Sequence, residues 1–96
     1  LENQCVVAMA SNVGDAAWCP AVDENTGMGG VFGPPDTGFP ATGVIAEGQL
    51  NRPGWTFAQA DLRQVEQVRA DGVVLNRSHW DEQPGRVEKA TTTRLR

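Results

Sequence analysis

The sequence lacks any apolar run of the roughly 18 residues that a transmembrane helix needs, so we expect no membrane association. It has one histidine, His79, and two cysteines, Cys5 and Cys19, without CxxC spacing. This pattern excludes a histidine-rich metal cluster and a disulfide framework, and we expect neither a metal nor a cofactor. A Cys5–Cys19 bridge stays open, but two reduced thiols are typical of a cytosolic protein, so we expect a cytoplasmic location.

Basic residues are absent from the first half of the chain. Residues 1–51 carry six acidic residues and no Lys or Arg, whereas residues 52–96 carry eight basic and six acidic residues. The whole chain of 96 residues has a net charge of −4. Phosphate binding needs clustered Lys and Arg, so this distribution argues against a nucleic-acid partner.

Three short segments have the composition of strands. Residues 5–10 are apolar and partly β-branched, which predicts a buried strand, and residues 43–47 predict a second short strand. Residues 55–60 predict a third, with Trp55 and Phe57 on one face. The first of these strands has no earlier strand to pair with, so we expect the chain to be cut from a larger fold.

One helix is predicted at residues 62–71. Asp61 is the expected N-cap, Gln64 would complete a capping box, and Gly72 stands where a glycine often ends a helix. One apolar stripe would be formed by Leu62, Val65 and Val68. The sequence becomes polar beyond the helix, and we expect residues 84–96 to form a disordered tail.

The tripeptide Asp36-Thr37-Gly38 occurs in retroviral-type aspartic proteases, where it ends an apolar strand and two copies share a proton. Prolines flank it here on both sides and exclude such a strand. We therefore expect a turn in which Asp36 accepts hydrogen bonds from its own backbone.

The order of segments is more informative than any one motif. Glu2-Asn3 precedes the apolar strand, residues 30–35 are followed by residues 43–48, and residues 55–62 lead into a helix with Arg69 near its end. In this order and spacing the segments resemble the C-terminal portion of the carbon–nitrogen hydrolase (nitrilase/amidase) superfamily. The resemblance covers about residues 1–83.

The resemblance implies an α+β fold of three to four strands and one helix, forming the C-terminal part of a four-layer α-β-β-α sandwich. Residues 1–83 would be a partial carbon–nitrogen hydrolase domain. Members of this family use a Cys nucleophile, a Glu general base and a Lys that stabilises the tetrahedral intermediate. All three lie upstream of the matched part, and Cys5 falls within a strand rather than in the family's strand-to-helix elbow. The resemblance therefore assigns no catalytic residue to this chain.

The resemblance also suggests where this chain would contribute. Asn12 and Trp18 would line the substrate pocket of the parent enzyme, which would act on a small-molecule amide or nitrile. In the family, C-terminal segments often pack across subunit interfaces, which would place Trp80 there. An isolated fragment would also expose the face of Trp55 and Phe57, so we expect these three residues at an interface of a homo-oligomer. We expect the chain alone to be inactive, and the alternative is a non-catalytic oligomerisation or interaction module.

Overall fold

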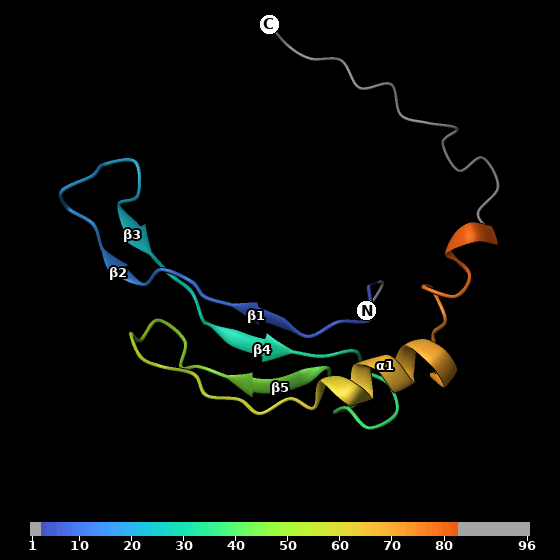
Figure 1. The fold of residues 1–96 in the computed structure, drawn as a ribbon. Helices are drawn as coiled ribbons and strands as arrows, with labels where there is room; N and C mark the ends of the chain where they lie inside the picture. The colour runs from blue at the N-terminus through green and yellow to red at the C-terminus, as the bar shows by residue number, and fades with distance from the viewer. Residues whose placement is uncertain (1–2, 83–96) are drawn as a thin grey trace, which may run out of the picture.

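Two antiparallel sheets and one α-helix make up residues 3–82, the part of the chain that this computed structural model describes (Figure 1). The α+β class and the single α-helix expected from the sequence are confirmed, but the described part has five short strands rather than three to four. The first sheet has the strand order β1-β4-β5, and the second pairs β2 with β3. The bounds are β1 Val7–Met9, β2 Gly14–Asp15, β3 Glu24–Asn25, β4 Gly30–Phe32, β5 Val44–Glu47, α1 Leu62–Asp71 and a 3-10 turn Trp80–Glu82.

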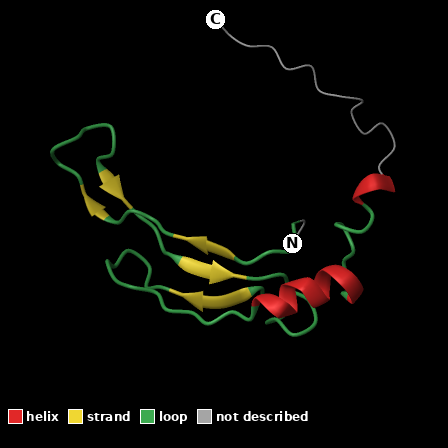
Figure 2. Cartoon of the chain, viewed as in Figure 1, coloured by secondary structure: helices red, strands yellow, loops and turns green. Residues whose placement is uncertain are grey.

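The two sheets are parts of one long hairpin. The pairing of Val7 with Phe32 in the first sheet is in register with the pairing of Asp15 with Glu24 in the second, since both steps span eight residues. The chain between the two sheets bends, and the β2–β3 end of the hairpin rises from the larger sheet (Figure 2). We call residues 14–25 the hairpin arm. Because the register is the same in both sheets, it determines which residues lie at the tip of the arm.

The third strand, β5, pairs with β4 after a turn of eleven residues, 33–43, that contains all three prolines of this region. The Gly33 amide donates to the Gly43 carbonyl at 2.8 Å and closes that turn. The expected strand at residues 43–47 is confirmed as β5. As expected, the proline-containing segment forms no strand.

The helix α1 has the bounds that the sequence predicts, and Asp61 is its N-cap. The Asp61 carboxylate accepts a hydrogen bond from the Arg63 amide at 3.0 Å and forms a salt bridge with the Arg63 guanidinium at 2.8 Å. The expected capping box is not formed, because the Gln64 side chain lies against Gly38 instead of returning to Asp61. The cap therefore depends on Asp61 and Arg63 alone.

The core of the described part is thin. Its buried hydrophobic side chains are Ala16, Val65 and Val68, and the polar Gln4 is also fully buried. The strand β1 is present, but the prediction that it is buried is wrong, since all three of its residues are exposed. The physical reason is visible in Figure 1, where α1 lies at one end of the sheet and no layer covers its faces.

The strand expected at residues 55–60 is not present. The segment runs extended alongside β5 (Figure 1) but has no strand pairing. Within residues 3–82, no helix is long and apolar enough to cross a membrane. The expected tail at residues 84–96 lies outside the described residues.

Candidate functional site

A groove lies where the hairpin arm leaves the larger sheet. One wall comes from the bend of the hairpin and the other from the loop that follows β5, and the open groove between them has a volume of about 710 Å³. We call this the elbow groove. Its side-chain lining comes mainly from Met9, Val13, Met28, Glu47, Arg52 and Trp55.

Hydrogen bonds hold the two walls of the elbow groove together. The Gly48 amide donates to the Gly29 carbonyl at 2.9 Å, and the Asn51 amide donates to the Gly27 carbonyl at 2.8 Å. The Gly27 amide returns a bond to the Asn51 side-chain oxygen at 2.9 Å. Asn51 can do this because it adopts a positive φ of 55° at the tip of its loop. The groove is therefore a fixed feature of the backbone.

The chemistry available in the elbow groove is limited. Glu47 and Arg52 are its charged side chains, Gln49 adds a carboxamide, and the remaining lining is apolar, hydroxyl or backbone. Among residues 3–82, no three His, Cys, Asp or Glu side chains gather in a way that could hold a metal ion. The groove is suited to binding an apolar group next to a charge, and it contains no thiol.

The two residues expected in a substrate pocket lie apart from each other. Asn12 is exposed in the bend between β1 and β2, next in sequence to Ser11 and Val13, which line the elbow groove. Trp18 lies at the tip of the hairpin arm with 84 % of its surface exposed. The chain itself does not bring Asn12 and Trp18 into one pocket.

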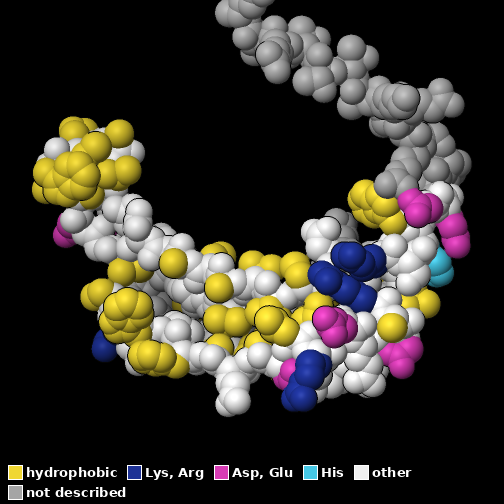
Figure 3. All heavy atoms as spheres, viewed as in Figure 1, with side chains coloured by type: hydrophobic (Ala, Val, Ile, Leu, Met, Phe, Trp, Pro, Cys, Tyr) yellow, Lys and Arg dark blue, Asp and Glu magenta, His cyan; other side chains and the backbone are white. Residues whose placement is uncertain are grey.

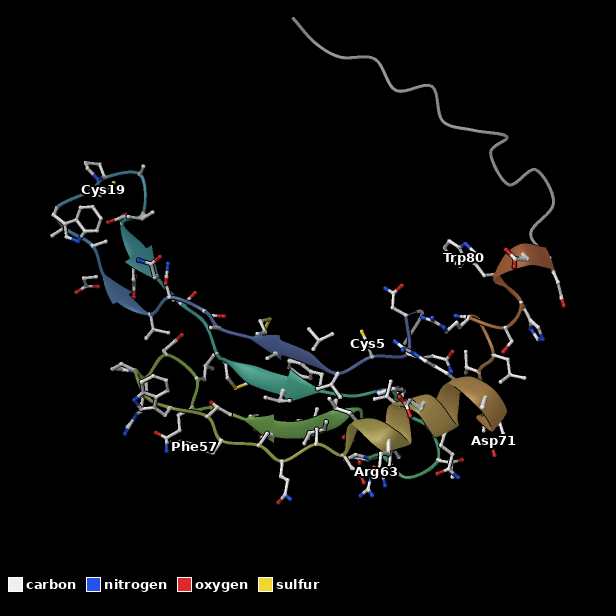
Figure 4. The ribbon with its side chains drawn as sticks, viewed as in Figure 1. Cys5, Cys19, Phe57, Arg63, Asp71 and Trp80 are labelled. Carbon is white, nitrogen blue, oxygen red and sulfur yellow. The ribbon has the colours of Figure 1, made fainter. Side chains whose placement is uncertain are left out.

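The three residues expected at an interface are all exposed. Trp55 and Phe57 are the most exposed of them, at 89 % and 83 %, and Trp55 also lines the elbow groove. Trp80 lies beyond α1 on the 3-10 turn, far from Phe57 in Figure 4. The sheet side and the helix end therefore carry separate aromatic surfaces.

Cys5 and Cys19 are free thiols, each partly buried. Cys5 lies just before β1, near the helix end of the sheet, and Cys19 lies at the tip of the hairpin arm (Figure 4). The disulfide that the sequence left open is therefore not formed within this chain. Neither thiol has a histidine hydrogen-bonded to it within the described residues, which is the arrangement a thiol nucleophile usually needs.

Asp36 occupies a small cradle of backbone amides. Its carboxylate accepts hydrogen bonds from the amides of Thr37 at 2.6 Å, Val73 at 3.0 Å and Val74 at 3.2 Å. The Val73 amide, followed by the Thr37 amide, holds the pKa of Asp36 below its ordinary value. The expected local bond to the turn backbone is present. The bonds from Val73 and Val74, which were not predicted, fasten the segment after α1 to the proline turn.

Gln4 is a fully buried polar residue whose burial was not predicted from the sequence. Its Nε2 donates to the Val68 carbonyl at 3.1 Å and to the Val74 carbonyl, while its Oε1 is buried without a partner among the described residues. Its backbone has a positive φ of 43°. No local pattern distinguishes Gln4, because its burial comes from contacts more than sixty positions away.

Comparison with protein-family models, with curated proteins and with solved structures found no match to this chain.

Proposed function

We propose that this chain is the C-terminal part of a carbon–nitrogen hydrolase that hydrolyses a small-molecule amide or nitrile with a Cys nucleophile located outside the chain. In this proposal the chain supplies one part of a layered α-β-β-α sandwich. Its role is to build the sheet that supports the catalytic residues and to shape one side of the pocket.

The main support for this proposal is that the sheet β1-β4-β5 has exposed residues along β1, with no second layer over them among the described residues. A sheet needs at least one face buried to be stable, yet β1 is exposed along its whole length and Val7 and Met9 are about half exposed. The outer edge of β1 is also unpaired in the sheet order β1-β4-β5. Strands that continue a sheet on that edge, and a second layer that covers its face, are what a sandwich fold would add.

The positions of the two free thiols also agree with a chain that supports the active site without supplying its nucleophile. Cys5 and Cys19 lie at opposite ends of the hairpin, and Lys89 is the one lysine of the sequence. A Cys–Glu–Lys constellation therefore cannot be assembled within residues 3–82. With an amide, a thiolate from another segment would attack the carbonyl carbon, the protonated amine or ammonia would leave, and water would hydrolyse the thioester. With a nitrile, the attack would give a thioimidate, a first water would convert it to the thioester with loss of ammonia, and a second water would hydrolyse the thioester.

The test is ammonia release from a panel of simple amides and nitriles. We expect turnover by the natural protein that contains this chain and no turnover by the 96 residues alone. Turnover by the 96 residues alone, lost on Cys5→Ala, would overturn the proposal.

A second candidate is a non-catalytic oligomerisation module, which is favoured by the exposure of Trp55 and Phe57. Two aromatic side chains that lie two positions apart, each more than four-fifths exposed, are typical of an association surface. For this candidate, the natural protein would release no ammonia from any amide or nitrile, and its self-association would weaken when the two side chains are replaced by serine.

A further inference from the structure

The chain bends sharply at Gln4, directly before β1. Gln4 has a φ of 43°, in the left-handed region that few residues other than glycine adopt. Both carbonyls that flank this bend accept hydrogen bonds from one guanidinium. The Nε of Arg69 donates to the Gln4 carbonyl at 3.0 Å, and its Nη2 donates to the Asn3 carbonyl at 3.3 Å. Successive carbonyls point to opposite sides of an extended chain but to one side of a helically turned chain, so the bend allows Arg69 to bind both.

The Gln4 side chain holds the same bend from the other direction. It is fully buried, and its Nε2 donates to the carbonyls of Val68, at 3.1 Å, and of Val74. A residue other than glycine stays in the left-handed conformation only where the surrounding contacts hold it there, and strained backbone of this kind is concentrated at functional sites. The bend at Gln4 is both strained and held by contacts on two sides, which indicates that its position matters to function.

The Arg69 side chain is directed to this bend. It is the basic residue in the last turn of α1, on the side of the molecule where basic side chains gather (Figure 3). It is partly buried and forms no ion pair with another of the residues 3–82. Hydrogen bonds from a charged donor are stronger than those between neutral groups. One side chain therefore contributes much of what holds the segment before β1 against α1.

Building on the hydrolase proposal, on which this step rests, we propose that Arg69 positions the nucleophilic thiol. In that proposal this chain is the C-terminal part of the enzyme, so the nucleophile precedes it in the sequence and joins the sheet through Asn3 and Gln4. By holding these two residues against α1, Arg69 sets how the preceding part lies relative to β1. A displacement of about 1 Å at a reacting atom can lower the rate roughly a hundredfold. Arg69 acts through the backbone without touching the substrate, which makes it a positioning residue.

The test is Arg69→Lys in the natural protein that contains this chain, in a Cys5→Ser/Cys19→Ser background so that neither thiol of this chain reacts. Lysine keeps the charge but carries its donors on one nitrogen, so it cannot span both carbonyls as a guanidinium does. We expect kcat for ammonia release to fall roughly tenfold or more while KM stays within about twofold, because binding is retained and alignment is lost. The pH midpoint for alkylation of the remaining reactive thiol should rise, since a displaced thiolate leaves the groups that lower its pKa.

Two matched variants separate positioning from stability. Arg63→Lys changes the same residue type at the exposed first turn of α1 and should leave kcat and the alkylation midpoint unchanged. Val65→Ala removes a buried side chain of α1 without touching the bend, so it should lower the unfolding temperature and retain kcat wherever the protein is folded.

Equal kcat values for Arg69→Lys and Arg63→Lys would overturn the positioning role and leave the hydrolase proposal in place. Equal losses of kcat in Arg69→Lys and Val65→Ala would do the same, since they would show general destabilisation. Absence of ammonia release before any change at position 69 would instead contradict the hydrolase proposal, and the positioning role with it.

Discussion

The Gln4 side chain donates a 3.1 Å hydrogen bond to the carbonyl of Val68, and the two residues are among the most completely buried of the described part. The contact joins the segment before β1 to the last turns of α1. The Arg69 guanidinium strengthens it by donating to the Gln4 carbonyl at 3.0 Å. Because few apolar side chains are buried between helix and sheet, these polar contacts determine where α1 lies.

Replacing Gln4 by alanine should destabilise the fold by about 1–3 kcal/mol, since it removes two long-range hydrogen bonds. The Val74 carbonyl loses its Gln4 donor, whereas the Val68 carbonyl keeps the Gly72 amide. Alanine keeps the Cβ at the positive φ of this position, so the change reports on the side-chain bonds. Chemical denaturation measures the effect, with the exposed Gln67→Ala on α1 as control. Equal stability of the two variants would contradict this role of Gln4.

We expect that position 72 requires glycine because there is no room there for a side chain. Its φ is −71°, which any residue adopts, but an added Cβ would lie 2.7 Å from an Asp36 carboxylate oxygen and would also meet the Val68 carbonyl. Gly72→Ala should therefore cost about 1–3 kcal/mol of unfolding free energy. Gly54→Ala is the matched control, since nothing lies within 4 Å of its added Cβ. A loss as large in Gly54→Ala would argue against the steric explanation.

Asp36 should make the chain segment after α1 sensitive to acid. The folded-state pKa of Asp36 is lowered, chiefly by the Val73 amide. The stabilisation is therefore present above the ordinary carboxyl value of about 3.8 and is lost as the pH falls through the lowered folded-state value. Amide exchange at Val73 and Val74 should accelerate over that acid range, and Asp36→Ala should accelerate it at neutral pH. Glu66→Ala is the reference variant. If the exchange rates of the Val73 and Val74 amides were the same in Asp36→Ala as in Glu66→Ala, Asp36 would not hold these amides.

Phe57 should contribute to self-association through its exposed ring. Phe57→Ser removes a side chain that is 83 % exposed, so it should lower association and the binding of an apolar dye while leaving folding intact. Sedimentation velocity of the natural protein measures the association. Gln59→Ser lies in the same extended segment and serves as control. Unchanged sedimentation of Phe57→Ser would remove Phe57 from the interface.

The elements that the sequence predicts well are those with local causes. The bounds of α1 follow from Asp61 and the spacing of Val65 and Val68, and β5 follows from its β-branched residues. Burial of β1 and pairing of residues 55–60 were predicted wrongly, because both depend on neighbouring layers rather than on composition.

The candidate site was predictable only in part. The sequence predicted Trp55 at an interface, and Trp55 is exposed in the structure, but the elbow groove that it lines was not predicted. The cradle around Asp36 and the burial of Gln4 depend on contacts with the segment after α1, which no periodicity encodes. Long-range polar contacts of this kind become visible only when the backbone is in place.

We propose that the nucleophile of a carbon–nitrogen hydrolase lies outside this chain, and an ammonia-release assay distinguishes this from a nucleophile within the chain. Ammonia release by the natural protein should persist in the Cys5→Ser/Cys19→Ser double variant and should still be abolished by thiol alkylation. That result would place the reactive thiol in another segment. Loss of turnover in a correctly folded double variant, or no ammonia from any amide or nitrile, would contradict the account.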